Sequence, residues 1–96
     1  MTVYAEQLLE RATQVLPASS DDFLLRGITA EATDRLVALK KADWRLRARY
    51  GSLEKLQQRI GVAGVTQDDH LLYTDLLEWG AIRHELSALV NLLEAL

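Results

Sequence analysis

The sequence predicts an all-α protein in which an N-terminal amphipathic helix precedes a long antiparallel helical hairpin. Leucine dominates the apolar residues and there is a single proline, a composition that favours helices over sheets. Two long segments repeat apolar residues at alternating steps of three and four, and a short glycine-containing segment separates them. The 96 residues are enough for one domain, so we expect residues 1–96 to form a single helical unit.

An N-terminal helix is predicted for residues 1–16, because apolar residues recur there with helical spacing. Pro17 should end it, since proline disfavours α geometry in the residue before it. Residues 17–28 are then expected to be a connector with one short helical turn, which Ser20 caps and Gly27 ends in a left-handed conformation. The apolar face of the N-terminal helix consists of Tyr4, Leu8, Leu9, Ala12 and Val15.

Residues 29–60 are predicted to form the first arm of the hairpin, with Thr29 as the N-cap of its helix. Gly51 interrupts the pattern, and we expect a break or kink there with Ser52 capping a separate short helix. The alternative is one continuous helix that contains this glycine at a cost of about 1 kcal/mol. The seam of the arm is Ala32, Leu36, Leu39, Asp43, Leu46, Tyr50 and Leu53.

Residues 61–65 are the predicted turn, and residues 66–96 are the second arm, whose helix Thr66 should open. A helix of roughly 30 residues is about 45 Å long, and such an apolar helix does not stand alone in water. Its seam again alternates steps of four and three and consists of Leu72, Leu76, Trp79, Arg83, Leu86, Val90 and Leu93.

The two seams also predict a register. A turn centred on Ala63 places Asp43 opposite Arg83, so the polar interruptions of both arms coincide. A buried unpaired charge is costly, whereas a bidentate Asp–Arg pair is tolerated and penalises other registers. We therefore expect a structural ion pair between these residues. The alternative is that both lie at the edge of the seam and reach water.

Charge is distributed unequally between the arms, although the net charge of the chain is only −3. Residues 40–59 carry a local charge of +5 and residues 66–96 a local charge of −5. The simplest interpretation is that the two arms complement each other across their flanking positions. An acidic protein partner is a second interpretation. The third is a nucleic-acid surface in which Lys40, Lys41, Arg45 and Arg49 contact phosphates and Trp44 stacks on a base.

No catalytic constellation is present in the sequence, and we expect neither enzyme activity, nor a cofactor, nor a small-molecule substrate. There is no cysteine, which excludes thiolate nucleophiles and thiolate metal sites. His70 and His84 are roughly 21 Å apart along a helix axis, so they cannot bind one metal ion. The first six residues do not resemble a signal peptide, and no segment is apolar enough to span a membrane. A cytoplasmic protein is therefore expected.

Binding to another polypeptide is the function that remains after these exclusions. The second arm has an extra apolar stripe, and exposing it would leave the kind of patch that marks interaction sites. The N-terminal helix, a second copy or another protein would have to cover it, and a homodimer that completes a helical bundle is the economical solution. Trp44 lies off the seam and covers either the first helix or a partner. The extra stripe consists of Ile82, Leu89 and Leu96.

Residues 49–56 (Arg-Tyr-Gly-Ser-Leu-Glu-Lys-Leu) and 75–79 (Asp-Leu-Leu-Glu-Trp) carry one resemblance to a known family. With the residues between them they cover about a third of the chain. This element resembles one in small helical antitoxins of prokaryotic toxin–antitoxin systems. The resemblance implies an inhibitor whose amphipathic N-terminal helix occupies a groove of the cognate toxin. Antitoxins usually have a DNA-binding half as well, and no segment here matches one.

Overall fold

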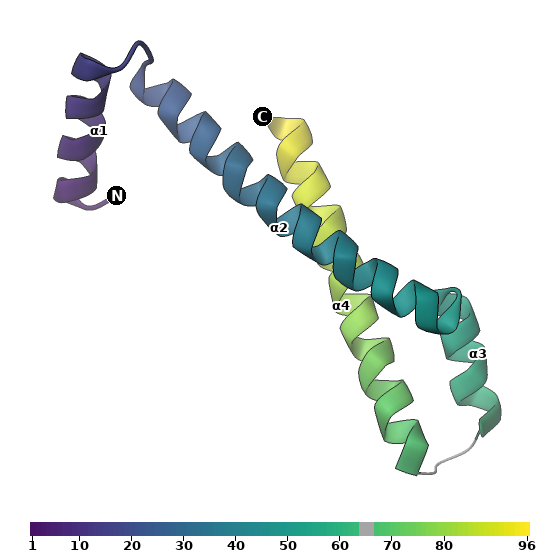
Figure 1. Ribbon diagram of the computed structural model, residues 1–96. Coiled ribbons are helices and arrows are strands. Elements are labelled where there is room, and N and C mark those ends of the chain that lie inside the picture. The colour runs from purple at the N-terminus through teal and green to yellow at the C-terminus, as the bar shows by residue number, and fades with distance from the viewer. Residues whose placement is uncertain (64–66) are drawn as a thin grey trace.

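The protein is all-helical over the residues that the computed structural model describes, which are 1–63 and 67–96. Within these ranges four helices follow one another and no strand occurs. They are α1 (Val3–Val15), α2 (Ser20–Tyr50), α3 (Leu53–Ala63) and α4 (Gln67–Ala95). The predicted all-α fold class is confirmed, and α2 with α3 forms one arm of the hairpin while α4 forms the other (Figure 1).

The predicted N-terminal helix agrees with α1 to within two residues at either end. Thr2 is its N-cap, and the threonine hydroxyl accepts a hydrogen bond from the backbone N–H of Ala5 at 3.1 Å. The helix ends at Val15, and Leu16 is already in the extended conformation that a following proline favours. Pro17 therefore ends the helix as expected.

The connector predicted for residues 17–28 is largely helical, so this prediction is wrong. The chain enters α2 at Ser20, where Ser19 is the N-cap and forms a reciprocal capping box with Asp22. Ser19 Oγ accepts from the backbone of Asp22 at 3.2 Å, and the Asp22 carboxylate accepts from the backbone of Ser19 at 3.0 Å. Gly27 and Thr29 lie inside the helix. The capping box starts the helix early, and the helix absorbs the cost of one internal glycine, about 1 kcal/mol.

Gly51 divides the first arm, which confirms the predicted break. Its φ of 89° is the only positive φ among the described residues, and it ends α2 after Tyr50. Ser52 then starts α3, because its Oγ accepts a hydrogen bond from the backbone of Lys55 at 3.1 Å. The turn predicted for residues 61–65 does not begin at Gly61, since α3 continues to Ala63. Residues 64–66, including the predicted cap Thr66, lie outside the described residues.

The core lies where α2, α3 and α4 meet. α4 crosses α2 near the middle of both helices, and α3 packs beside the first half of α4 (Figure 1). Burial of leucine, isoleucine and tryptophan side chains at this point is the main contribution to the stability of the fold, at about 25 cal/mol per Å² of apolar surface. The buried apolar cluster consists of Leu39, Leu46, Leu56, Leu72, Trp79 and Ile82.

The molecule is much longer than a compact domain of the same size. Its extents are 63 × 23 × 18 Å and its radius of gyration is 20.2 Å. A compact chain of this length would have a radius of gyration of about 12 to 13 Å. The reason is visible in Figure 1, where α1 and the N-terminal half of α2 extend away from the crossing point. A large part of the chain is therefore outside the core.

Candidate protein interface

A buried polar contact holds the centre of the hairpin. Trp79 is completely buried, and its indole Nε1 donates a hydrogen bond of 2.7 Å to Asp43, which is 9% exposed. The other carboxylate oxygen of Asp43 lies 3.4 Å from the guanidinium of Arg47, one turn further along α2. The predicted ion pair between Asp43 and Arg83 is not among the ion pairs of the described residues, and Arg83 is exposed.

The register of the hairpin explains why Asp43 contacts Trp79 and not Arg83. Asp43 meets α4 at Trp79, four residues or about one helical turn before Arg83. The prediction assumed two straight arms that run side by side from one turn. Instead the chain bends at Gly51 and α2 crosses α4 at an angle, so facing residues do not follow a single constant register (Figure 1).

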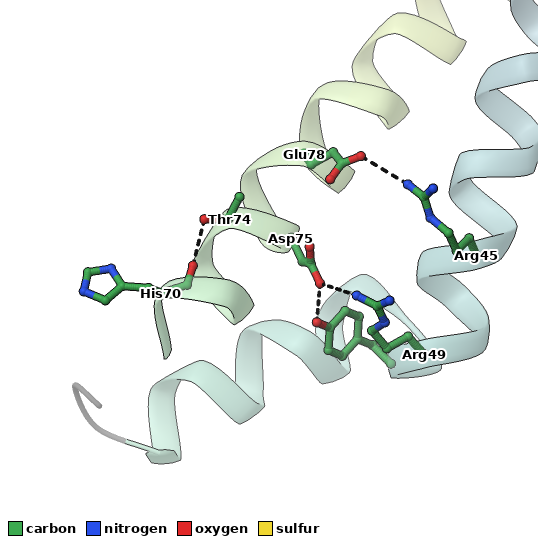
Figure 2. A network of polar contacts seen from close by, with 7 residues as sticks. Arg45, Arg49, His70, Thr74, Asp75 and Glu78 are labelled. Atoms are coloured by element: carbon green, nitrogen blue, oxygen red, sulfur yellow. Dashed lines mark hydrogen bonds and ion pairs between the residues drawn. The ribbon is translucent and has the colours of Figure 1, made fainter. Parts of the chain in front are cut away.

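A second polar cluster joins the C-terminal end of α2 to α4 (Figure 2). The carboxylate of Asp75, which is buried, accepts hydrogen bonds from the Arg49 guanidinium at 3.0 Å and from the Tyr50 hydroxyl. Burial raises the pKa of Tyr50, and the hydrogen bond to Asp75 raises it further. The pKa of Arg49 is also raised, first by the Tyr50 hydroxyl and then by Asp75. Tyr50 packs against Trp79, with ring centroids 6.4 Å apart.

Ion pairs between the arms confirm that their opposite charges complement each other. Arg45 reaches Glu78 at 3.4 Å (Figure 2), and Arg35 forms a two-bond pair with Glu85 at 2.7 and 3.0 Å. Arg35 lowers the pKa of Glu85, and Glu85 raises the pKa of Arg35. These pairs are exposed, so each contributes little to stability and mainly favours one pairing of the arms.

The residues considered for nucleic-acid contact have different neighbours in the structure. Arg45 and Arg49 lie on the side of α2 that faces α4, where they pair with Glu78 and Asp75. Lys40 and Lys41 line a shallow hollow with Val37 and Trp44. Trp44 is 76% exposed, so in this chain it does not cover the first helix.

Apolar side chains gather at the end of the molecule that is opposite the Gly51 bend, and we call this region the apolar end. α1 has no buried residue, and Val15 is 82% exposed. Where α2 and α4 diverge, a hollow is lined by apolar groups of both helices, including Ile28, Ala32, Leu89 and Leu92. The exposed members of the apolar end are Tyr4, Leu8, Val15, Leu16, Leu24, Leu25, Ile28, Leu92 and Leu96.

The predicted interface residues have different positions in the structure. Tyr4, Leu8 and Val15 are exposed, whereas Leu9 and Ala12 are half-buried on α1. Leu96 is exposed and Leu89 is half-buried. Ile82 was expected to need the N-terminal helix or another chain to cover it, but it is 7% exposed and belongs to the hairpin core. The prediction for Ile82 is wrong because α2 crosses α4 and covers both of its apolar stripes near the crossing point.

Sequence reasoning missed the apolar residues at the start of α2. Leu24, Leu25 and Ile28 fall in the connector that the sequence predicts for residues 17–28, and this connector separates them from the predicted hairpin arm. The signal that would have revealed them is the capping pattern at Ser19 and Asp22, since a box at that point predicts a helix through the following residues.

The described residues contain no group of three or more histidine, aspartate or glutamate side chains that could hold a metal ion. None of the helices in the same part of the chain combines the length and the apolar character that crossing a membrane requires. No protein-family model matches the chain, and no curated protein and no solved structure is significantly similar to it.

Proposed function

We propose that this protein is a non-catalytic protein–protein interaction module that binds a partner through its apolar end. The observation that carries the proposal is the state of α1, a 13-residue amphipathic helix without a single buried residue. Isolated helices of this length are marginal in water, and most helices in proteins are stabilised by packing of their apolar face. A partner that covers this face would supply the missing packing.

The mode of binding that fits the apolar end is the packing of amphipathic helices into apolar grooves. α1 presents Tyr4, Leu8 and Val15 on one exposed stripe. The hollow between Ile28, Ala32, Leu89 and Leu92 offers an apolar groove for a helix of the partner. Such interfaces use apolar anchors at spacings of three, four and seven residues. The apolar end thus provides both a helix and a groove.

An antitoxin-like inhibitor is the form of this function that we favour, on the strength of the resemblance in residues 49–79. In that form α1 occupies a groove of a cognate toxin and blocks it. Support comes from the exposure of α1 and from the short connector, residues 16–19, which is all that joins α1 to α2.

The test is the molar mass of the complex that the protein forms in its native host. We expect a complex that contains another protein and is heavier than two chains of 10.8 kDa, and we expect that protein to be lost for Leu8→Glu. The matched control is Gln14→Glu, which adds the same charge on another exposed face of α1. The proposal is wrong if the protein is isolated without another protein, or if both variants leave the complex intact.

A further inference from the structure

α2 carries a second line of apolar and small residues on the face that points away from the hairpin. With 3.6 residues per turn, this line lies about 145° around the helix from the buried residues of α2. All of its members are exposed, and none belongs to the hydrophobic core. We call this line the outer seam, and it consists of Ala30, Thr33, Val37, Trp44 and Ala48.

Two shallow hollows follow each other along the outer seam. One is lined by Val37, Lys40, Lys41 and Trp44. The other lies nearer the start of the helix and is lined by residues between Leu25 and Asp34, with Ala30 and Thr33 among them. The seam is therefore bulky at one end, where the Trp44 indole projects, and open at the other, where small side chains leave space.

We propose that a second copy of this chain docks on the outer seam, with the two α2 helices antiparallel about a two-fold axis near residue 39. In this arrangement Ala30 faces Ala48 of the partner subunit, and Trp44 fills the hollow beside Thr33 of the partner subunit. Each copy supplies one indole and one hollow, as an isologous interface requires. A parallel arrangement would instead place the two indoles against each other.

Charged residues that flank the seam match the same arrangement. Asp34 and Lys41 lie on the same flank of α2, and that flank faces its own copy in an antiparallel pair. Asp34 therefore approaches Lys41 of the partner subunit, and the contact occurs twice. Lys40 lies on the opposite flank and approaches its own copy, but it is exposed and solvent screens the repulsion.

The surface area of the chain leaves room for such an interface. Its accessible surface is 7365 Å², whereas a compact monomer of 10.8 kDa would expose about 5,500 Å². The excess is about 1,800 Å², and a standard stable interface buries about 800 Å² on each partner. The outer seam can be covered by a second copy while the apolar end keeps its own partner.

α1 of the same chain is too short to cover Trp44, which lies toward the C-terminal end of the outer seam. Trp44 lies 24 residues from the start of α2, or about 36 Å along its axis. α1 has 13 residues and is about 20 Å long, so folded back along α2 it ends well short of Trp44. Any cover for Trp44 therefore has to come from another chain, and the self-complementary seam favours a second copy.

Paired cysteines test the register directly, because the chain has no cysteine of its own. Ala30→Cys and Ala48→Cys in one chain lie about 27 Å apart along α2, too far for an internal bridge. We expect the double variant to form a covalent dimer on oxidation, and each single variant to stay unlinked. Linkage of either single variant, or no linkage of the double variant, overturns the proposed register.

Light scattering on the purified full-length chain tests the dimer itself. We expect twice the mass of one chain, and Trp44→Ser should raise the dissociation constant about tenfold or more, as buried interfacial tryptophans do. The control is Leu77→Ser, which removes an exposed apolar side chain from α4. A monomer at every accessible concentration, or equal effects of both substitutions, would assign the seam to a different protein and refute the inference.

Exchanging the charges of Asp34 and Lys41 tests the pairing in a third way. If the two substitutions weakened dimerisation only by disturbing the fold, combining them would not restore it. Asp34→Lys and Lys41→Asp should each weaken dimerisation several-fold, and the chain that carries both should dimerise like the original protein. Lys55→Asp combined with Asp34→Lys is the matched control and should not restore dimerisation, because Lys55 belongs to α3. Failure of the exchange to restore dimerisation contradicts the antiparallel pairing. The inference does not depend on what binds the apolar end.

Discussion

Trp79 donates its indole N–H to the carboxylate of Asp43 across the centre of the hairpin, at 2.7 Å. Both residues are buried, and the bond links the middle of α2 to the middle of α4. The contact satisfies a polar group on each arm that would otherwise be costly to bury. It also favours the observed register, because a shift of the arms would separate a buried donor from a buried acceptor.

Substitution of Trp79 by phenylalanine should therefore destabilise the protein by about 3 kcal/mol, since it leaves Asp43 without its buried donor and creates a small cavity. Arg83→Ala should change the free energy of unfolding by less than about 0.5 kcal/mol, because Arg83 is exposed. Urea unfolding followed by circular dichroism measures both values. Equal losses for the two variants would contradict the specific contribution of the Asp43–Trp79 contact.

Tyr50 should make the hairpin less stable at alkaline pH. Its folded-state pKa is raised above the ordinary value of 10.0, first by burial and then by the hydrogen bond to Asp75. A raised pKa means that the stabilisation is fully present below pH 10.0 and is lost as the pH rises through the folded-state value. Tyr50→Phe should cost about 1 kcal/mol at neutral pH and reduce the alkaline loss. Tyr73→Phe, at an exposed position, is the control and should do neither.

The ion pair between Arg35 and Glu85 should be detectable at acid pH. Arg35 lowers the pKa of Glu85 below its ordinary value of 4.5. The stabilisation is therefore present above pH 4.5 and is lost as the pH falls through the lower folded-state value. In a carboxyl titration by NMR, Arg35→Gln should move the pKa of Glu85 back toward 4.5, whereas Arg26→Gln should not. An unchanged Glu85 titration in Arg35→Gln would contradict the pairing of these arms.

Gly27 inside α2 and Gly51 directly after it should respond to alanine in opposite directions. Gly27 lies inside the helix, and an added Cβ would meet no atom within 4 Å. Gly27→Ala should therefore stabilise the protein by about 0.5 to 1 kcal/mol. Gly51 has a φ of 89°, and its added Cβ would lie 3.1 Å from Cδ of Lys55. Gly51→Ala should destabilise by about 1 to 2 kcal/mol.

Thermal unfolding of the two glycine variants gives the comparison. A rise of the melting temperature for Gly27→Ala would show that α2 is continuous from Ser20, because a glycine in a left-handed turn would not tolerate alanine. A fall for Gly27→Ala would favour the connector that the sequence predicts for residues 17–28. A Gly51→Ala protein as stable as the original would contradict the bend between α2 and α3.

Structural features that depend on residues close together in the chain could be predicted from the sequence. Pro17 ends α1, Gly51 and Ser52 separate α2 from α3, and steps of three and four residues predict a long final helix. The start of α2 was misplaced because two local signals compete there. The capping box at Ser19 favours early entry into the helix, and it outweighs the preference of Gly27 for a turn.

The candidate interface was predictable only in part. The sequence predicts α1 as an amphipathic helix that needs a partner, and its residues Tyr4, Leu8 and Val15 are exposed in the structure. Ile82 appeared as surface, but the crossing of α2 over α4 buries it. Trp44 appeared off the seam, and only the structure shows that its neighbours Val37, Lys40 and Lys41 form a hollow with it.

The sequence by itself determined the helical fold, the break at Gly51 and the complementary charges of the two arms, because each depends on spacing or composition along the chain. The tertiary structure decided which residues face each other. The angle at which α2 and α4 cross brings Asp43 to Trp79 instead of Arg83 and leaves α1 outside the core. That angle depends on how side chains of both helices interdigitate over many residues, and no single position in the sequence encodes it.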